Sequence, residues 1–382
     1  MSPDRESCEL LREIVRPETQ VSADRIARIL PTIQNWDALL TLARSHGILP
    51  LLYLRVVNQQ ADIPRSSFER IQSDYNRNVL HSLTNAAELI SVLKDLSEKS
   101  IPAMPFKGVV LSATAYRDLA ARPAGDLDVL IFYRDLIPAA AALLNRGYEL
   151  ETSTREDGSP AIENYYEYHF ERQSDGMVLE LRWRLELTQP RFRRNLGMNW
   201  VWPAKRSTLL AGAEVPEMEP EIALLVLCMH GSKHVWSRLI WICDVARLLE
   251  THPGMNWKRV RSEAKARGLS RALALGVLLA HRVGEAVIPE AVLRVFESDS
   301  TARSLAHHIA DNLFERPGST PESRLPYHVQ LLGFNDRMKM LFSIDFLRPN
   351  ARDRAVVGLP KALEPLYFFI RPFRILWDKT AR

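Results

Sequence analysis

Cysteine is scarce in this chain. Three cysteines, Cys8, Cys228 and Cys243, are spread over 382 residues, and no two of them form a C-x-x-C pair. A disulfide framework or a cysteine-ligated zinc site needs more cysteines at closer spacing, so both are excluded. This usage is typical of a protein from a reducing compartment, and we expect a cytoplasmic location.

Long apolar runs are absent as well. Residues 1–17 are charged throughout and contain no apolar core of signal-peptide length. No later segment reaches the roughly 20 apolar residues that a membrane-spanning helix needs. The sequence therefore predicts a protein that is neither secreted nor integral to a membrane.

The chain also lacks the charge of a dedicated nucleic-acid binder. Its net charge is +4, and residues 345–382 carry eight Lys/Arg against four Asp/Glu, which accounts for the whole excess. The rest of the chain has as many acidic as basic residues, so we do not expect a long nucleic acid as a partner. Within the basic tail, residues 367–377 are rich in aromatic side chains, and we expect them to pack against the N-terminal helices. Contact of this tail with a membrane surface is the alternative.

The spacing of apolar residues changes along the chain. Three- and four-residue spacing predicts helices up to about residue 100, at 23–30, 35–47 and 83–100, with Ser22 and Asn35 as N-caps. Strands are predicted next, at 101–106, 127–133, 166–173 and 177–185, with helices at 108–119 and 133–147 between them. Polar or irregular loops are expected at 152–161 and 314–327. From Glu219 the pattern is helical again, which predicts an α+β protein with a helical N-terminal region (1–100), an α/β core (101–200) and a helical C-terminal domain (201–382).

Asp126 and Asp128 stand at the start of the apolar run 127–133. Because side chains alternate along a strand, the two carboxylates share a face, where they repel unless a cation lies between them. Mg²⁺ prefers such oxygen ligands, and paired metal ions are typical of phosphoryl and nucleotidyl transfer. In the neighbouring predicted strand, alternation places Glu180 and Arg182 on one face, and Glu180 is our candidate for a third acid.

Lys107 and Gly108 lie between a short predicted strand and a predicted helix. Gly108 would let the backbone approach a phosphate, and the free N–H groups of the following helix would face it. Lys107 would add a positive charge. An Asp-x-Asp pair alone is common in solvated turns, but its combination with Lys-Gly and a third acid is much more specific.

These residues carry a resemblance to a known family. The pattern is Lys107-Gly108, Tyr116, Arg122-Pro123, Asp126-Leu127-Asp128, and Glu180 followed by Trp183. It resembles an uncharacterised bacterial nucleotidyltransferase family of the superfamily that includes DNA polymerase β. Residues 230–249 and both ends of the chain are similar to the same family. The resemblance implies a small polymerase-β-like sheet core flanked by helical regions.

The resemblance also implies an activity. A nucleoside monophosphate would be moved from an NTP to a hydroxyl or phosphate of an unknown acceptor, with release of pyrophosphate. Asp126, Asp128 and Glu180 would be the catalytic residues and would hold two Mg²⁺ ions, with Mn²⁺ as a substitute. The nucleotide would be bound by Lys107, Gly108, Arg122 and Arg182. A small molecule, peptide or protein is the favoured acceptor; a non-catalytic nucleotide sensor and an RNA-modifying nucleotidyltransferase are the alternatives.

Two positions depart from the family pattern. The wider superfamily has Gly-Gly or Gly-Ser where Lys107-Gly108 stands, and the family often has His where this chain has Arg182. Because Arg182 shares a face with Glu180, it would either bind a phosphate or partly neutralise Glu180 and weaken metal binding.

Other polar residues have two interpretations each. His230, Lys233 and His234 are expected to line the cleft opposite the metals. A purely structural role of these three residues is almost equally well supported. A zinc site at the two histidines is disfavoured because no H-E-x-x-H motif is present. Asp244 lies among apolar residues and is expected to pair with Arg238 or a nearby histidine. His169 is expected on a solvated sheet face, with contact to the site as the alternative.

Overall fold

The N-terminal region is helical. The computed structural model describes residues 4–18, 20–151, 166–185, 196–315 and 325–331. Its first helices are α1 (Arg5–Ile14), α2 (Ala23–Ile29), α3 (Trp36–Ser45) and α4 (Leu49–Val56), with short 3₁₀ turns η1 (Leu30–Thr32) and η2 (Val57–Asp62). Both predicted N-caps are confirmed, because Ser22 accepts from the Arg25 N–H and Asn35 accepts from the Ala38 N–H.

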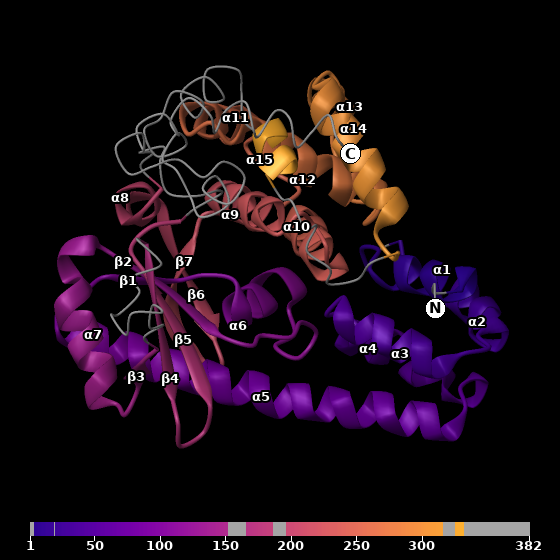
Figure 1. The fold of residues 1–382 in the computed structure, drawn as a ribbon, viewed down its shortest axis with the longest axis horizontal. Coiled ribbons are helices and arrows are strands. Elements are labelled where there is room, and N and C mark those ends of the chain that lie inside the picture. The colour runs from indigo at the N-terminus through magenta and orange to yellow at the C-terminus, as the bar shows by residue number, and fades with distance from the viewer. Residues whose placement is uncertain (1–3, 19, 152–165, 186–195, 316–324, 332–382) are drawn as a thin grey trace, which may run out of the picture.

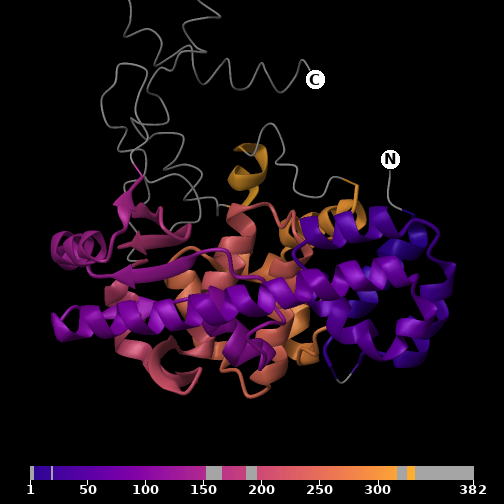
Figure 2. The same ribbon diagram turned by 90° about the horizontal axis from the view of Figure 1, so that it is seen from below.

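Helix α5 (Arg65–Glu98) is much longer than the helix predicted over 83–100, which forms only its second half. The first half has few buried side chains and therefore a weak apolar signal. Figure 1 shows α5 running below both the sheet and the N-terminal helices, and Figure 2 shows it crossing almost the whole described structure. The helix thus joins the N-terminal region to the sheet.

One mixed sheet forms the centre of the core. Its strands are β1 (Ala103–Pro105), β2 (Leu127–Ile131), β3 (Glu149–Leu150), β4 (Glu167–Arg172) and β5 (Met177–Arg182), in the order β1-β2-β5-β4-β3. Strands β2 and β5 are parallel, and the other neighbouring pairs are antiparallel. With helices on both sides, this confirms the predicted α+β class.

The connections differ in part from the prediction. Helix α6 (Gly108–Leu111) passes into a π-helical turn, η3 (Ser112–Tyr116), and stops at Arg117, whose φ of 55° is left-handed. It is shorter than the helix predicted over 108–119. The turn η4 (Tyr133–Asp135) and helix α7 (Leu136–Asn145) follow β2, and Gly147 with φ 80° comes after α7 as predicted.

The two faces of the sheet meet different partners. Leu127, Val129 and Leu179 pack with the second half of α5 and with α7. The opposite face, which carries Leu130, belongs to the core formed with the N-terminal and C-terminal helices. Figure 1 shows α9 and α10 above the sheet and α5 below it. Asp128 and Glu180 therefore lie on the face directed toward the C-terminal helices.

A hairpin precedes the C-terminal helices and was not predicted. It consists of β6 (Lys205–Leu210) and β7 (Ala213–Met218), after α8 (Met198–Val201) and η5 (Trp202–Ala204). Its two-residue turn has positive φ at both Ala211 (47°) and Gly212 (87°). The prediction of a purely helical pattern after residue 200 missed this element, since Pro216 within β7 weakens the strand signal.

The remaining helices lie beyond the hairpin. They are α9 (Pro220–Lys233), α10 (Leu239–Thr251), α11 (Trp257–Ala266), α12 (Ser270–Arg282), α13 (Glu290–Glu297), α14 (Ser300–Asn312) and α15 (Leu325–Leu331). Residues 325–327, predicted as irregular, begin α15. The predicted loop at 152–161 and the aromatic tail segment 367–377 lie outside the described residues. Among those that are described, no helix has the length and apolarity to cross a membrane.

Candidate active site

The three predicted carboxylates come together where the start of β2 lies beside β5. The parallel register of β2 and β5 pairs Asp128 with Glu180, and Asp126 immediately precedes β2. One ligand oxygen from each of the three residues lies within 4.8 Å of the other two. Strand pairing between segments far apart in the sequence thus builds an acidic triad.

The carboxylates of this triad differ in their environment. Burial and the neighbouring Asp128 raise the pKa of Asp126, and the same two causes raise the pKa of Glu180. Asp128 is only 4% exposed, and burial favours its neutral form, but Lys107 and Arg182 hold its pKa below the usual value. The triad therefore carries more negative charge than its surroundings readily accommodate.

Lys107 extends directly into the triad. Its Nζ lies 2.9 Å from Asp128 Oδ2, and its backbone has φ 58° and ψ −144°, a conformation that favours glycine. Gly108 also has positive φ, 45°, and a Cβ there would lie 3.5 Å from the carbonyl oxygen of Asp126. The Lys-Gly turn holds a strained backbone that delivers an ammonium group to the carboxylates.

Arg182 is the second cation of the site. Its Nε lies 3.2 Å from Asp128 Oδ1, and its Nη atoms form ion pairs with Glu180 and Glu167. His169 lies between the same acids, with Nε2 3.4 Å from Glu167 Oε1 and Nδ1 3.5 Å from Glu180 Oε1. Glu167 had not been predicted, and His169 was expected on a solvated face, yet both belong to this cluster.

The residues fit a hard divalent cation. Asp128 Oδ1 is buried and accepts no hydrogen bond from the described residues, although Arg182 Nε is near. Carboxylate oxygens are the ligands that Mg²⁺ prefers, and the triad offers three of them in reach of one ion. An acceptor atom without a hydrogen bond beside two further carboxylates is therefore compatible with a metal ligand.

The end of α9 faces the triad from the other side. Burial lowers the pKa of Lys233, and the next cause is Arg182; its Nζ lies 5.4 Å from the centre of the Tyr166 ring. Burial and then Lys107 lower the pKa of His230 well below its usual value. His230 and Lys233 therefore lie near enough to Lys107 and Arg182 to be influenced by their charges, and their role as cleft residues stays a prediction.

The turn after α9 is held in an unusual conformation. Val235 and Trp236 follow His234 with φ of 58° and 53°, both left-handed. Trp236 is fully buried, and a Cβ at Gly231 would lie 2.5 Å from its ring. The tryptophan packs where only glycine leaves room, and this packing fixes the turn that carries His234.

The sequence of residues 33–285 matches the family described as "Uncharacterised nucleotidyltransferase". The chain belongs to this family. None of the curated proteins matches it. The family region contains the triad, the Lys-Gly turn and the end of α9, so these features lie inside the part that the nucleotidyltransferase family shares.

A zinc site at His230 and His234 has no third ligand among the described residues. The rings of His230 and His234 lie 4.8 Å apart and both pack against Trp241. Over the described ranges, the acidic triad is the one group of three metal-ligating side chains. The two histidines and Trp241 thus form an aromatic cluster.

Arg122 lies in a different cluster. Its Nε and Nη2 donate to Oδ1 and Oδ2 of Asp244 at 2.8 and 3.0 Å, and Nη1 donates to the Pro123 carbonyl. The hydroxyl of Tyr116 donates to the same Asp244 Oδ1 at 2.7 Å. The expected pairing of Asp244 with Arg238 or a histidine was wrong, because Arg122 is its partner. A role of Arg122 in nucleotide binding stays a prediction and would require it to leave Asp244.

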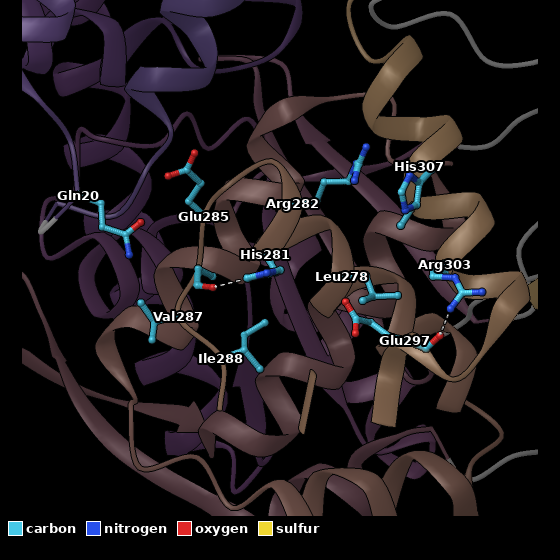
Figure 3. A pocket seen from close by; sticks show the side chains of 12 residues that line it. Gln20, Leu278, His281, Arg282, Glu285, Val287, Ile288, Glu297, Arg303 and His307 are labelled. Carbon is cyan, nitrogen blue, oxygen red and sulfur yellow. Dashed lines mark hydrogen bonds between the residues drawn. The ribbon is translucent and has the colours of Figure 1, made fainter. Parts of the chain in front are cut away.

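A large cavity lies elsewhere. It has a volume of about 670 Å³ and lies between the end of α12 and α14 (Figure 3). Its charges have local partners: Glu285 pairs with Arg16, and Arg303 donates to the Glu297 carbonyl at 3.1 Å. Its lining mixes basic side chains (His281, Arg282, Arg303 and His307) with Glu285 and Glu297, and among the described residues it holds no group of three metal-ligating side chains. We therefore place the candidate active site at the triad.

Proposed function

We propose that this chain transfers a nucleoside monophosphate from an NTP to an acceptor and releases pyrophosphate, with Mg²⁺ held by Asp126, Asp128 and Glu180. The observation that carries the proposal is the convergence of three carboxylates within 4.8 Å, one of them with a buried oxygen that accepts no hydrogen bond from the described residues. Membership of the nucleotidyltransferase family supports it.

Each residue near the triad receives a role in this proposal. Bound divalent ions would stabilise the charge that develops on the phosphate oxygens, and Mn²⁺ is expected to substitute for Mg²⁺. Lys107 and Arg182 bind nucleotide phosphates, and the fork of an arginine can grip two oxygens at once. Gly108 leaves the backbone beside them open to the same phosphates. Arg122 would bind the nucleotide only after leaving its pair with Asp244.

The acceptor is assigned to the α9 side. His230, Lys233 and His234 would bind a small molecule, peptide or protein there and direct its hydroxyl or phosphate toward the triad. Glu180 would help to remove the proton from an acceptor hydroxyl. An RNA acceptor would instead give steeply salt-dependent binding.

A nucleotide sensor without catalysis is the second candidate. The observation that favours it is the pairing of Asp128 with both Lys107 and Arg182, which already neutralises part of the triad. A sensor would retain nucleotide affinity when Asp128 is changed to Asn. An enzyme that needs the metal would lose its nucleotide affinity in this variant.

Isothermal calorimetry with the four NTPs, with and without Mg²⁺, tests the proposal. The proteins are the wild type, Asp128→Asn, Glu180→Gln and the control Glu171→Gln, which alters a carboxylate on β4 opposite Val178, outside the triad. We expect micromolar binding, worth about 8 kcal/mol, of at least one NTP only with Mg²⁺. Loss in Asp128→Asn and Glu180→Gln but not in Glu171→Gln would support the proposal. Equal NTP binding without Mg²⁺ would contradict it.

A further inference from the structure

Arg182 contacts carboxylates from three neighbouring strands. Asp128 lies on β2, Glu180 on β5 and Glu167 on β4, and each faces a different nitrogen of the guanidinium group. Asp128 and Glu180 belong to the acidic triad, whereas Glu167 does not. The arginine therefore competes with a metal ion for two carboxylates and holds a third one that the metal does not need.

The contact between Arg182 and Asp128 is poorly made. The two atoms are 3.2 Å apart, but neither Arg182 Nε nor Asp128 Oδ1 takes part in an aligned hydrogen bond among the described residues. A buried polar atom without a hydrogen bond is costly, and a metal ion would satisfy this oxygen better than the misaligned N–H does. The contact between Arg182 Nε and Asp128 Oδ1 is the one that a divalent ion would replace.

Glu167 is a partner that can hold Arg182 when its other two carboxylates bind a metal. Its side chain is 5% exposed, and removal of a partner from a buried ion pair leaves an uncompensated charge. His169 also contacts Glu167, at 3.4 Å, but the arginine is its permanently charged partner. When a metal takes Asp128 and Glu180, the Arg182–Glu167 ion pair is left in place, although Glu167 Oε2, like Asp128 Oδ1, lacks an aligned hydrogen bond.

We propose that Arg182 is a resident counter-ion of the triad, which yields Asp128 and Glu180 to a divalent cation and is retained by Glu167 as a positioning residue. The inference rests on the proposed function, since it takes the triad to be the metal site. The guanidinium nitrogens that the metal displaces become available to a nucleotide phosphate. Metal and nucleotide then favour each other's binding, because each keeps Arg182 away from the metal ligands.

Binding of Mn²⁺ alone, measured as free ion by electron paramagnetic resonance, tests this inference without any turnover. The proteins are the full-length wild type, Arg182→Met, Glu167→Gln, the double variant and the control Glu171→Gln. Arg182→Met should tighten Mn²⁺ binding on the order of tenfold, because a competing cation next to two ligands is removed. Glu167→Gln should weaken Mn²⁺ binding by a similar factor, since Arg182 then has no carboxylate outside the triad to pair with. Glu167→Gln should have little effect in the double variant, where Arg182 is absent.

The outcomes separate the two proposals. If the wild type binds Mn²⁺ and Arg182→Met binds it no more tightly, the counter-ion inference is overturned while the metal site stands. If neither protein binds Mn²⁺ beyond the level of Asp128→Asn, both are overturned. Thermal unfolding in EDTA shows which variants fold. If Arg182→Met fails to fold, the comparison of Glu167→Gln with Glu171→Gln decides. Weaker Mn²⁺ binding in Glu167→Gln alone supports the inference, and equal Mn²⁺ binding by the two variants overturns it.

Discussion

Two of the buried arginine–carboxylate clusters among the described residues are built differently. Arg122 donates to both oxygens of Asp244 in a two-pronged pair, and Tyr116 donates a further hydrogen bond. Arg182 divides its nitrogens among three carboxylates, and its contact with Asp128 lacks hydrogen-bond alignment.

The difference separates a structural pair from a functional one. In the Arg122 cluster, charges balance and the hydrogen bonds are made, so its burial is compensated and any third group would only disturb it. In the Arg182 cluster, acid exceeds base, since Asp126 adds a carboxylate that Arg182 does not contact. Excess charge together with an unmade hydrogen bond indicates a site that binds something further.

The largest expected effect comes from breaking the balanced pair. Asp244→Ala leaves Arg122 buried without its carboxylate, and we expect a loss of about 3 to 5 kcal/mol in the free energy of unfolding. Denaturant unfolding followed by circular dichroism measures it. Asp244→Asn, which keeps one acceptor oxygen, should lose less. A loss below about 1 kcal/mol for Asp244→Ala would mean that the pair is not a structural element.

A buried histidine between the end of α3 and the start of α10 is a further buried polar group, and its contribution to stability depends on pH. His46 Nδ1 accepts the Leu239 N–H at 3.1 Å, and burial, followed by Arg238, lowers the pKa of His46 to about 4 from its ordinary value of 6.5. Protonation would place a hydrogen on Nδ1 and break this bond. Because the unfolded chain binds the proton first, stability is present above pH 6.5 and is lost as the pH falls toward 4.

The loss over this pH window should be roughly 3 kcal/mol. His46→Gln offers an acceptor to the Leu239 N–H but does not titrate. Chemical unfolding at pH 7, 6, 5 and 4 of the two proteins measures the difference in slope. Parallel curves would show that His46 is not a source of acid sensitivity.

The smallest expected effect sharpens the contrast at the triad itself. Asp126→Asn removes one carboxylate from the acidic excess, and because burial and Asp128 raise the pKa of Asp126, its charge costs stability at neutral pH. We expect the metal-free protein to gain up to about 1 kcal/mol while Mg²⁺ binding weakens. Thermal unfolding in EDTA and Mg²⁺ titration measure the two changes. A loss of stability in EDTA would contradict the idea of excess charge.

The sequence predicted which acidic side chains share a face within each strand, because that signal is local. The period of two over residues 126–128 and 178–182 fixes which side chains share a face, and the structure pairs Asp128 with Glu180. The short connection of residues 173–176, which contains Gly176, indicates that β4 pairs with β5, but nothing in the sequence indicates that β5 lies beside β2. That neighbour relation decides whether the face is solvated or part of the site.

Other features depend on contacts between distant segments. The pair of Arg122 and Asp244 joins the core to α10, and a sequence alone offers several arginines and histidines as equal candidates. Helix α5 was predicted only where its buried face is apolar. The domain boundaries at residues 100 and 200 stay predictions.

The parallel pairing of β2 and β5 has a consequence for how the protein folds. Between these strands the chain passes through α7, β3 and β4, so Asp128 and Glu180 meet only after this long connection has closed. Contacts of such large sequence separation form late because loop closure must precede them. A divalent ion at the proposed site would therefore find its ligands only in the nearly finished fold, and its binding would slow unfolding without guiding the chain toward the native state.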